Sequence, residues 1–90
     1  WEAMAHGVPT IAFDHCGMHD SICDDCGVRV PMGDIEQMVA GLAEAIGRLA
    51  GNRRRVAELK AGAWHCARRN SWDTRRRTWN ALYDLAIERY

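Results

Sequence analysis

The chain has 90 residues, of which 48% are hydrophobic, and its twelve basic and twelve acidic side chains give a formal net charge of zero. One small domain fits this length, and the hydrophobic share excludes disorder over most of it. No apolar run approaches the roughly 20 residues that span a bilayer. Residues 1–10 lack the basic start of a secretory signal.

Charge is divided unevenly along the chain. Residues 1–34 carry six acidic side chains and one basic one, whereas residues 35–90 carry six acidic and eleven basic ones. Such a split can mark a half that binds a polyanion, or two parts that attract each other. Most of the arginines fall into three groups, at 53–55, 68–69 and 75–77. Because no nucleic-acid motif accompanies these groups, we interpret them as solvated helix faces and expect no nucleic-acid partner.

The first residues predict a helix end, a tight turn and a buried strand. Residues 1–6 look like the last turns of a helix, in which Glu2, Ala3, Met4 and Ala5 are adequate helix formers. Gly7 suits the position just past a helix end, and Pro9 prevents the helix from continuing. The short, nearly apolar segment Thr10–Phe13 is typical of a strand buried on both faces of a parallel sheet.

A polar loop and a second strand follow. A short helical turn is predicted at 18–22, and Cys23-Asp24-Asp25 is predicted to be a turn. The alternating segment Gly27–Val30 predicts a second strand near a sheet edge, with Arg29 facing outwards. The helical turn between the strands favours parallel pairing.

Three longer helices are predicted in the rest of the chain. Asp34 and Gln37 form a capping-box pattern before a helix from Ile35 to about Leu49. Asn52 and Ser71 are expected to cap the next two helices, Arg53–Cys66 and Trp72 to about Glu88. The expected apolar stripe of the first helix is Ile35, Met38, Val39, Leu42, Ile46 and Leu49, that of the second is Val56, Leu59, Ala63 and Cys66, and that of the third is Trp72, Trp79, Leu82, Tyr83, Ala86 and Tyr90. The alternation predicts an α/β fold with two short parallel strands and three main helices.

The opening Glu2-Ala3-Met4-Ala5, continued by Gly7 and Pro9, resembles a segment of one known family. The pattern is similar to E-A-M-A-x-G-x-P in the retaining glycosyltransferases of the GT-B fold, which use nucleotide-sugar donors and include the glycogen synthases. Later segments keep the family's order: a glycine loop at Cys16–Asp20, a strand at Gly27–Val30, a turn at Pro31–Asp34 and an aromatic-led final helix at Asn70-Ser71-Trp72. The resemblance covers essentially all 90 residues.

The resemblance implies that residues 1–90 are the C-terminal part of a partial Rossmann-like nucleotide-sugar-binding domain, without the N-terminal acceptor domain. The whole enzyme would be a cytoplasmic hexosyltransferase that transfers a sugar with retention of configuration, and the inner membrane surface is a further possible place for it. The first glutamate of the family's E-x7-E pair and the basic residues that hold the donor diphosphate would precede residue 1. The 90 residues alone are therefore expected to be inactive. His19 and Asp20 also depart from the family's usual proline and glutamate.

The resemblance gives Glu2 the role of accepting hydrogen bonds from the donor ribose, and a hydroxyl pair suits the two oxygens of a carboxylate. Without it, an exposed helix glutamate would be the simpler interpretation. Gly17 and Met18 are candidate donor-loop residues, although a plain tight turn explains them too. The sequence predicts no catalytic residue and no cofactor besides the donor substrate. The expected partners are the nucleotide sugar and the N-terminal domain, with self-association of the 90 residues as a further possibility.

A small zinc-stabilised binding module, built on the segment His15–Cys26, is the alternative function. Within it, Cys16-x-x-His19 and Cys23-x-x-Cys26 each have the spacing of a metal-binding pair. Four such ligands could close a tetrahedral zinc site. The three-residue gap between the pairs is shorter than in zinc ribbons.

Overall fold

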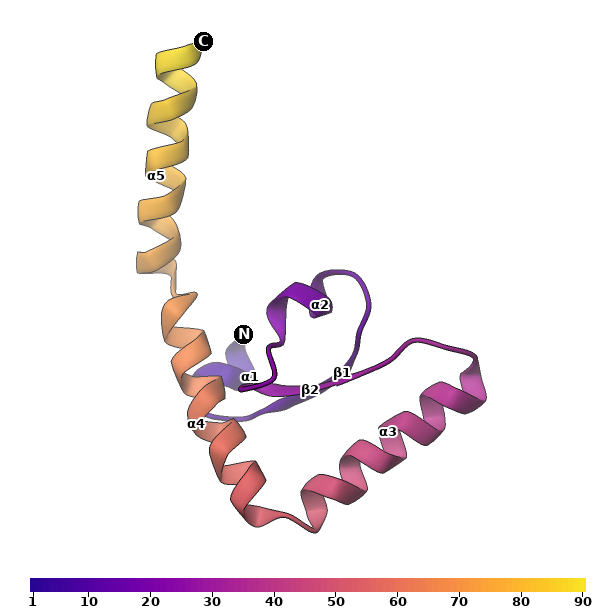
Figure 1. Cartoon of the computed structure of the whole chain (residues 1–90). Helices are drawn as coiled ribbons and strands as arrows, with labels where there is room; N and C mark the ends of the chain where they lie inside the picture. The colour runs from indigo at the N-terminus through magenta and orange to yellow at the C-terminus, as the bar shows by residue number, and fades with distance from the viewer.

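The computed structural model describes all of residues 1–90 (Figure 1). The chain is mostly helical, in the order α1 (Glu2–Ala5), β1 (Thr10–Phe13), α2 (Gly17–Ser21), β2 (Gly27–Val30), α3 (Ile35–Ala50), α4 (Arg53–Arg69) and α5 (Trp72–Arg89). This content agrees with the expected mixed α/β class, with two short strands and three long helices. No helix is both long and apolar enough to cross a membrane.

The two strands pair in parallel, as predicted, and Thr10 lies opposite Gly27 at the start of the ladder. Gly27 is required there because a Cβ on it would lie 2.2 Å from the backbone oxygen of Thr10. At the other end, Phe13 lies opposite Val30, and the backbone N–H of Asp14 donates to the oxygen of Val30 at 2.8 Å. Both strands therefore end at the same edge of the sheet.

The helix boundaries follow local capping chemistry. Asp34 and Gln37 form the predicted capping box at the start of α3, and the side chains of Asn52 and Ser71 cap α4 and α5. Gly7 has φ of 69°, the left-handed conformation expected after α1. The main difference is at the end of α4, which runs to Arg69 instead of Cys66. Only two residues separate it from α5.

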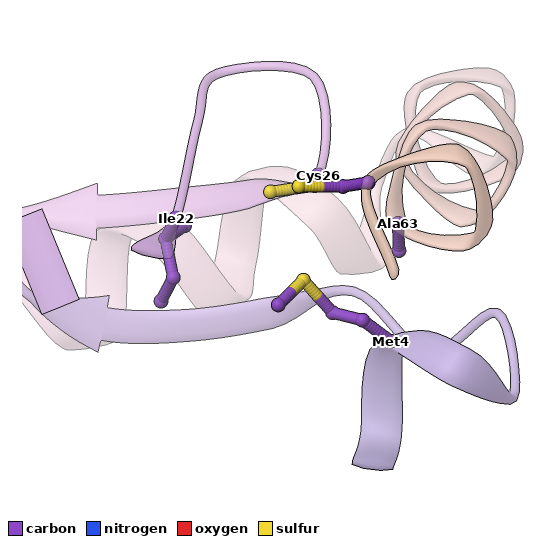
Figure 2. Close-up of a cluster of buried hydrophobic side chains, with 5 residues drawn as sticks. Met4, Ile22, Cys26 and Ala63 are labelled. Carbon is purple, nitrogen blue, oxygen red and sulfur yellow. The ribbon is translucent and has the colours of Figure 1, made fainter. Parts of the chain in front are cut away.

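A small core lies where α1, the strands and α4 meet. Its members are Met4, Ile22, Cys26, Ala63 and Cys66. Figure 2 shows the side chains of Met4, Ile22 and Cys26, which come from different segments, gathered near the strands and the turn of α4 that carries Ala63. Helix α4 packs as predicted, because Leu59, Ala63 and Cys66 of its expected stripe are all buried.

Helix α3 packs through only part of its predicted stripe, of which Met38, Leu42 and Leu49 are half-buried. Ile35, Val39 and Ile46 are 81%, 62% and 53% exposed, whereas Ala45 is buried. Gly41 lies so close to β2 that a Cβ on it would be 2.7 Å from Cγ1 of Val30. Two short strands are narrower than the stripe, so the covered face includes one side of it together with the small residues Gly41 and Ala45.

Helix α5 has no buried residue, so its predicted apolar stripe is exposed along its whole length. The helix extends away from the rest of the chain (Figure 1). The molecule measures 52 × 30 × 16 Å with a radius of gyration of 16.6 Å, whereas a compact 90-residue domain has about 12 Å. Its accessible surface is 7130 Å², which exceeds that of a compact monomer of this mass by about 1,800 Å². Much apolar surface is left uncovered.

Candidate functional site

The carboxyl edge of the sheet is the first place to look for a site. In open parallel sheets, ligands bind in the crevice outside the carboxyl ends of the strands. Phe13 and Val30 end the two strands side by side, and the bond from Asp14 to Val30 joins the segments that leave them. Two segments therefore lie at this edge, a loop at 14–16 that leads into α2 and the turn at 31–34.

The loop after β1 has an unusual backbone. Cys16 has φ of 49° and ψ of −138°, and it is the only residue other than glycine with a positive φ. Residues with a Cβ rarely adopt such angles, and the conformation costs of order 1–3 kcal/mol. The preceding N–H of His15 donates to the oxygen of Phe13 at 2.8 Å, which closes a tight turn directly after the strand. Such strain is found most often at ligand-binding loops.

Side chains hold the two ends of this loop together. Nδ1 of His19 lies 2.5 Å from Oδ1 of Asp14. Both groups are accessible to solvent, so the pair contributes at most about 1 kcal/mol. Arg29, predicted to face outwards, instead lies half-buried beneath α2, where it donates to the backbone oxygen of His19 at 3.2 Å and to Asp24 at 3.1 Å. Arg29 thus connects β2 to α2 and to the turn that follows it, within the segment between the strands.

Gly17 and Met18 begin α2 and are both exposed. A Cβ added to Gly17 would meet no atom within 4 Å, and its φ is not in the left-handed region. The packing of this chain therefore does not require glycine at position 17. The space beside its backbone is open to an approaching molecule.

Glu2 lies in the first turn of α1, which packs on α4, and its side chain is exposed. No hydrogen bond or ion pair joins its carboxylate to another side chain or to the loop at 14–16. Its oxygens are free to accept hydrogen bonds from outside the chain. Of the predicted donor-site residues, the structure thus groups Gly17 with Met18, and it places Glu2 on a separate element.

Three of the four thiols gather at a second location. The Sγ atoms of Cys23 and Cys26 are 3.1 Å apart, and the two thiols form a group with Cys66 in which all ligand atoms lie within 4.8 Å of one another. The predicted set of Cys16, His19, Cys23 and Cys26 does not form this group. Cys16 is exposed, and His19 is paired with Asp14. Cys66, which was not among the predicted ligands, occupies the third position.

The two thiols of the Cys-x-x-Cys turn differ in acidity. Burial, followed by the hydrogen bond with Cys23, raises the pKa of Cys26 to about 12. Burial also works against the thiolate of Cys23, but hydrogen bonds with Cys26, with the backbone at Asp25 and with Cys66 outweigh it and lower the pKa of Cys23 below its usual value. Cys23 is therefore the thiol that ionises first.

A groove of about 450 Å³ lies between β2, α3 and the start of α4. Its lining includes three arginines, but each has a partner: Arg29 pairs with Asp24, Arg48 with Glu44, and Arg55 with Glu58. Glu2, Gly17 and Met18 do not line it. Because its positive charges are already paired, the groove offers no unpaired cation to an anionic ligand.

Two site features have only weak signals in the sequence. Cys66 is 40 positions beyond Cys26, and its only indication was its place on the core-facing stripe of α4. Gly62 looks like an ordinary helix glycine, but a Cβ on it would lie 1.7 Å from the backbone oxygen of Asp25. This close approach brings the turn at 23–26 against α4, and with it two thiols against the third.

Comparisons with known proteins add no relative. No profile of a known protein family matches the chain, no curated protein matches it significantly, and neither does any solved structure.

Proposed function

We propose that this chain is the C-terminal part of the donor-binding domain of a retaining GT-B-fold glycosyltransferase. The whole enzyme transfers a hexose from a nucleotide-diphosphate-sugar to an acceptor. The observation that carries the proposal is the loop after β1, where a strained Cys16 precedes an unshielded Gly17 at the carboxyl edge of a parallel strand pair. In the glycosyltransferases that the chain resembles, the loop at this position approaches the donor.

The order of elements supports the proposal. The segment that resembles E-A-M-A-x-G-x-P includes α1, the left-handed Gly7 and the entry into β1. The segment that resembles the proline-glycine-aspartate turn ends on Asp34, the cap of α3. In this proposal β1 and β2 are the last strands of a larger Rossmann-like sheet, the rest of which the complete domain supplies.

Each candidate residue has a chemical role in the proposed donor site. Glu2 accepts hydrogen bonds from the ribose hydroxyls, which its exposed and unpaired carboxylate is free to do. Gly17 lets the donor approach the backbone, and Met18 lies beside it. Stabilisation of the leaving diphosphate, the main contribution to catalysis in such a site, comes from groups outside these 90 residues. The chain alone is therefore expected to show no transfer.

The uncovered apolar surface also supports a larger protein. The stripe of α5, together with the exposed Ile35, Val39 and Ile46 of α3, is the surface that the remaining domains would cover. An excess of about 1,800 Å² over a compact monomer exceeds the roughly 800 Å² that one partner buries in a standard protein interface. The N-terminal acceptor domain is the proposed partner for α5.

The test uses the complete reading frame that contains this chain. We expect a glutamate eight positions before Glu2, preceded by a strand and a pair of basic residues. We expect the complete protein to transfer sugar from one member of a panel of uridine, guanosine and adenosine diphosphate sugars, with retention shown by NMR of the product. A reading frame without that glutamate, or a folded complete protein inactive with the whole panel, would contradict the proposal. Turnover by residues 1–90 alone would contradict the predicted inactivity.

A further inference from the structure

The thiol cluster joins two parts of the chain that are distant in sequence. Cys23 and Cys26 lie on the turn before β2, and Cys66 lies in the last turn of α4. We propose that these three thiols form a binding site for a single thiophilic divalent cation, with Zn²⁺ as the physiological occupant. The inference does not depend on the proposed sugar transfer, because the three thiols share no residue with the proposed donor site of Glu2, Gly17 and Met18.

The spacing of the sulfur atoms suits such a cation. Zinc–sulfur bonds of about 2.3 Å place the sulfurs of a tetrahedral site about 3.8 Å apart. The three Sγ atoms lie within 4.8 Å of one another, and the Cys23–Cys26 separation of 3.1 Å must widen as the cation binds. The site therefore forms by small side-chain adjustments.

The backbone holds the ligands in place before any cation binds. Gly62 permits the contact of α4 with the oxygen of Asp25, and Nη2 of Arg55 donates to the oxygen of Asp24 at 2.9 Å. Both contacts fix the turn on α4. The backbone N–H of Cys23 also donates to Sγ of Cys26 at 3.1 Å. Such a hydrogen bond orients a sulfur ligand and stabilises its negative charge.

Chemistry favours a soft cation over harder ones. Three sulfur donors with no carboxylate or imidazole in the group select zinc or cadmium over magnesium or calcium. Cys26 and Cys66 are buried, whereas Cys23 is partly exposed, so the cation would be reached from the side of Cys23. The three thiols lose their protons as the cation binds, and a water molecule completes the tetrahedron.

The experiment titrates the reduced 90-residue chain with Zn²⁺ against a chromophoric chelator, and with Cd²⁺ while thiolate charge-transfer absorption is recorded. We expect one cation per chain and an absorption intensity that corresponds to three thiolates. Cys66→Ser should weaken Zn²⁺ binding by at least about 10-fold, the lower end of the loss seen even for outer-shell groups. Cys16→Ser is the matched control and should leave affinity unchanged. Circular dichroism checks that each variant keeps its helices.

A second measurement uses the unaltered chain and does not depend on variants. Reduced protein with one equivalent of Zn²⁺ is treated with iodoacetamide, and the modified peptides are identified by mass spectrometry. We expect Cys16 to be alkylated and Cys23, Cys26 and Cys66 to be protected. The assignment would be overturned if Zn²⁺ protected Cys16 from alkylation. It would also be overturned if Cys16→Ser lost affinity for Zn²⁺, or if Cys66→Ser kept it. So would a reduced chain that binds no Zn²⁺ and forms only a Cys23–Cys26 disulfide on oxidation.

Discussion

Gly62 of α4 lies against the backbone oxygen of Asp25 so closely that a Cβ on residue 62 would come within 1.7 Å of it. Since that contact is with backbone, no side-chain rotation relieves it. The packing of the Cys-x-x-Cys turn on α4 therefore depends on a residue without a side chain.

Replacement of Gly62 by alanine should destabilise the chain despite the higher helix propensity of alanine. Overpacking of this kind lowers the free energy of unfolding by about 1–3 kcal/mol, whereas the higher helix propensity of alanine raises it by about 1 kcal/mol. Denaturant unfolding followed by circular dichroism measures the change. Gly47→Ala in α3 is the control, because a Cβ there meets nothing within 4 Å, and it should stabilise by up to about 1 kcal/mol. Equal stabilisation by both alanines would contradict the observed contact.

Cys16→Gly should stabilise the chain by about 1 kcal/mol, because glycine adopts a positive φ without strain. Cys16→Ser keeps a Cβ at the same position and should change the free energy of unfolding little. Comparison of the two variants by thermal and denaturant unfolding separates the backbone effect from loss of the thiol. A loss of stability in Cys16→Gly would show that the loop is not strained as described.

In the complete enzyme, Glu2→Gln should weaken donor binding. Loss of a hydrogen bond to a charged group costs about 1.5–3 kcal/mol, which corresponds to roughly 10- to 100-fold in affinity. Isothermal titration with the donor that the panel identifies provides the measurement. Glu36→Gln, an exposed glutamate in the first turn of α3, is the control and should bind normally. Gly17→Ala should not destabilise the chain but should weaken donor binding, since its Cβ meets only the space proposed for the ligand.

Thiol reactivity should separate Cys23 from Cys26 in metal-free, reduced protein. The thiolate is the nucleophile, so a thiol reacts faster as pH rises through its pKa. Because the pKa of Cys23 is lowered and that of Cys26 is about 12, Cys23 should be alkylated first throughout the neutral range. Cys26→Ala removes the strongest hydrogen bond that lowers the pKa of Cys23 and should slow its alkylation near pH 8. Peptide mass spectrometry in a Cys16→Ser background follows both sites, and equal rates at pH 8 would refute the assignment.

The apolar stripe of α5 should drive self-association of the isolated 90 residues. Trp79, Leu82 and Tyr83 are exposed on one face of the helix, and exposed apolar patches of this kind mark interaction surfaces. Leu82→Glu should therefore lower the association constant measured by sedimentation equilibrium. Asn80→Glu adds the same charge away from the centre of the stripe and should have little effect. A chain that stays monomeric at all concentrations would contradict this expectation.

Local signals predicted the elements well. The capping box of Asp34 and Gln37, the caps Asn52 and Ser71 and the left-handed Gly7 were all identified from neighbouring residues. Each of these features depends on hydrogen bonds or torsion angles within one turn. Parallel pairing of the strands was predicted as well, because a helical turn separates them and excludes a tight hairpin.

Features that depend on distant contacts were missed or only partly predicted. The stripe of α3 was assigned from periodicity alone, but only an adjoining surface can decide which residues of an apolar stripe are covered, and β2 contacts Gly41 instead of Val39. Cys66 could not be grouped with Cys23 and Cys26 without knowing that Gly62 lets α4 approach their turn. The role of Arg29 beneath α2 likewise depends on where the segment between the strands folds back.

The exposure of α5 also determines how the chain loses its structure. An 18-residue helix with no buried residue has little more than the marginal stability of a helix in water. Its opening exposes none of the core formed by Met4, Ile22, Cys26, Ala63 and Cys66. Unfolding of the isolated chain is therefore not a single cooperative transition: amide hydrogens of α5 exchange with solvent through local opening, well before those of α4.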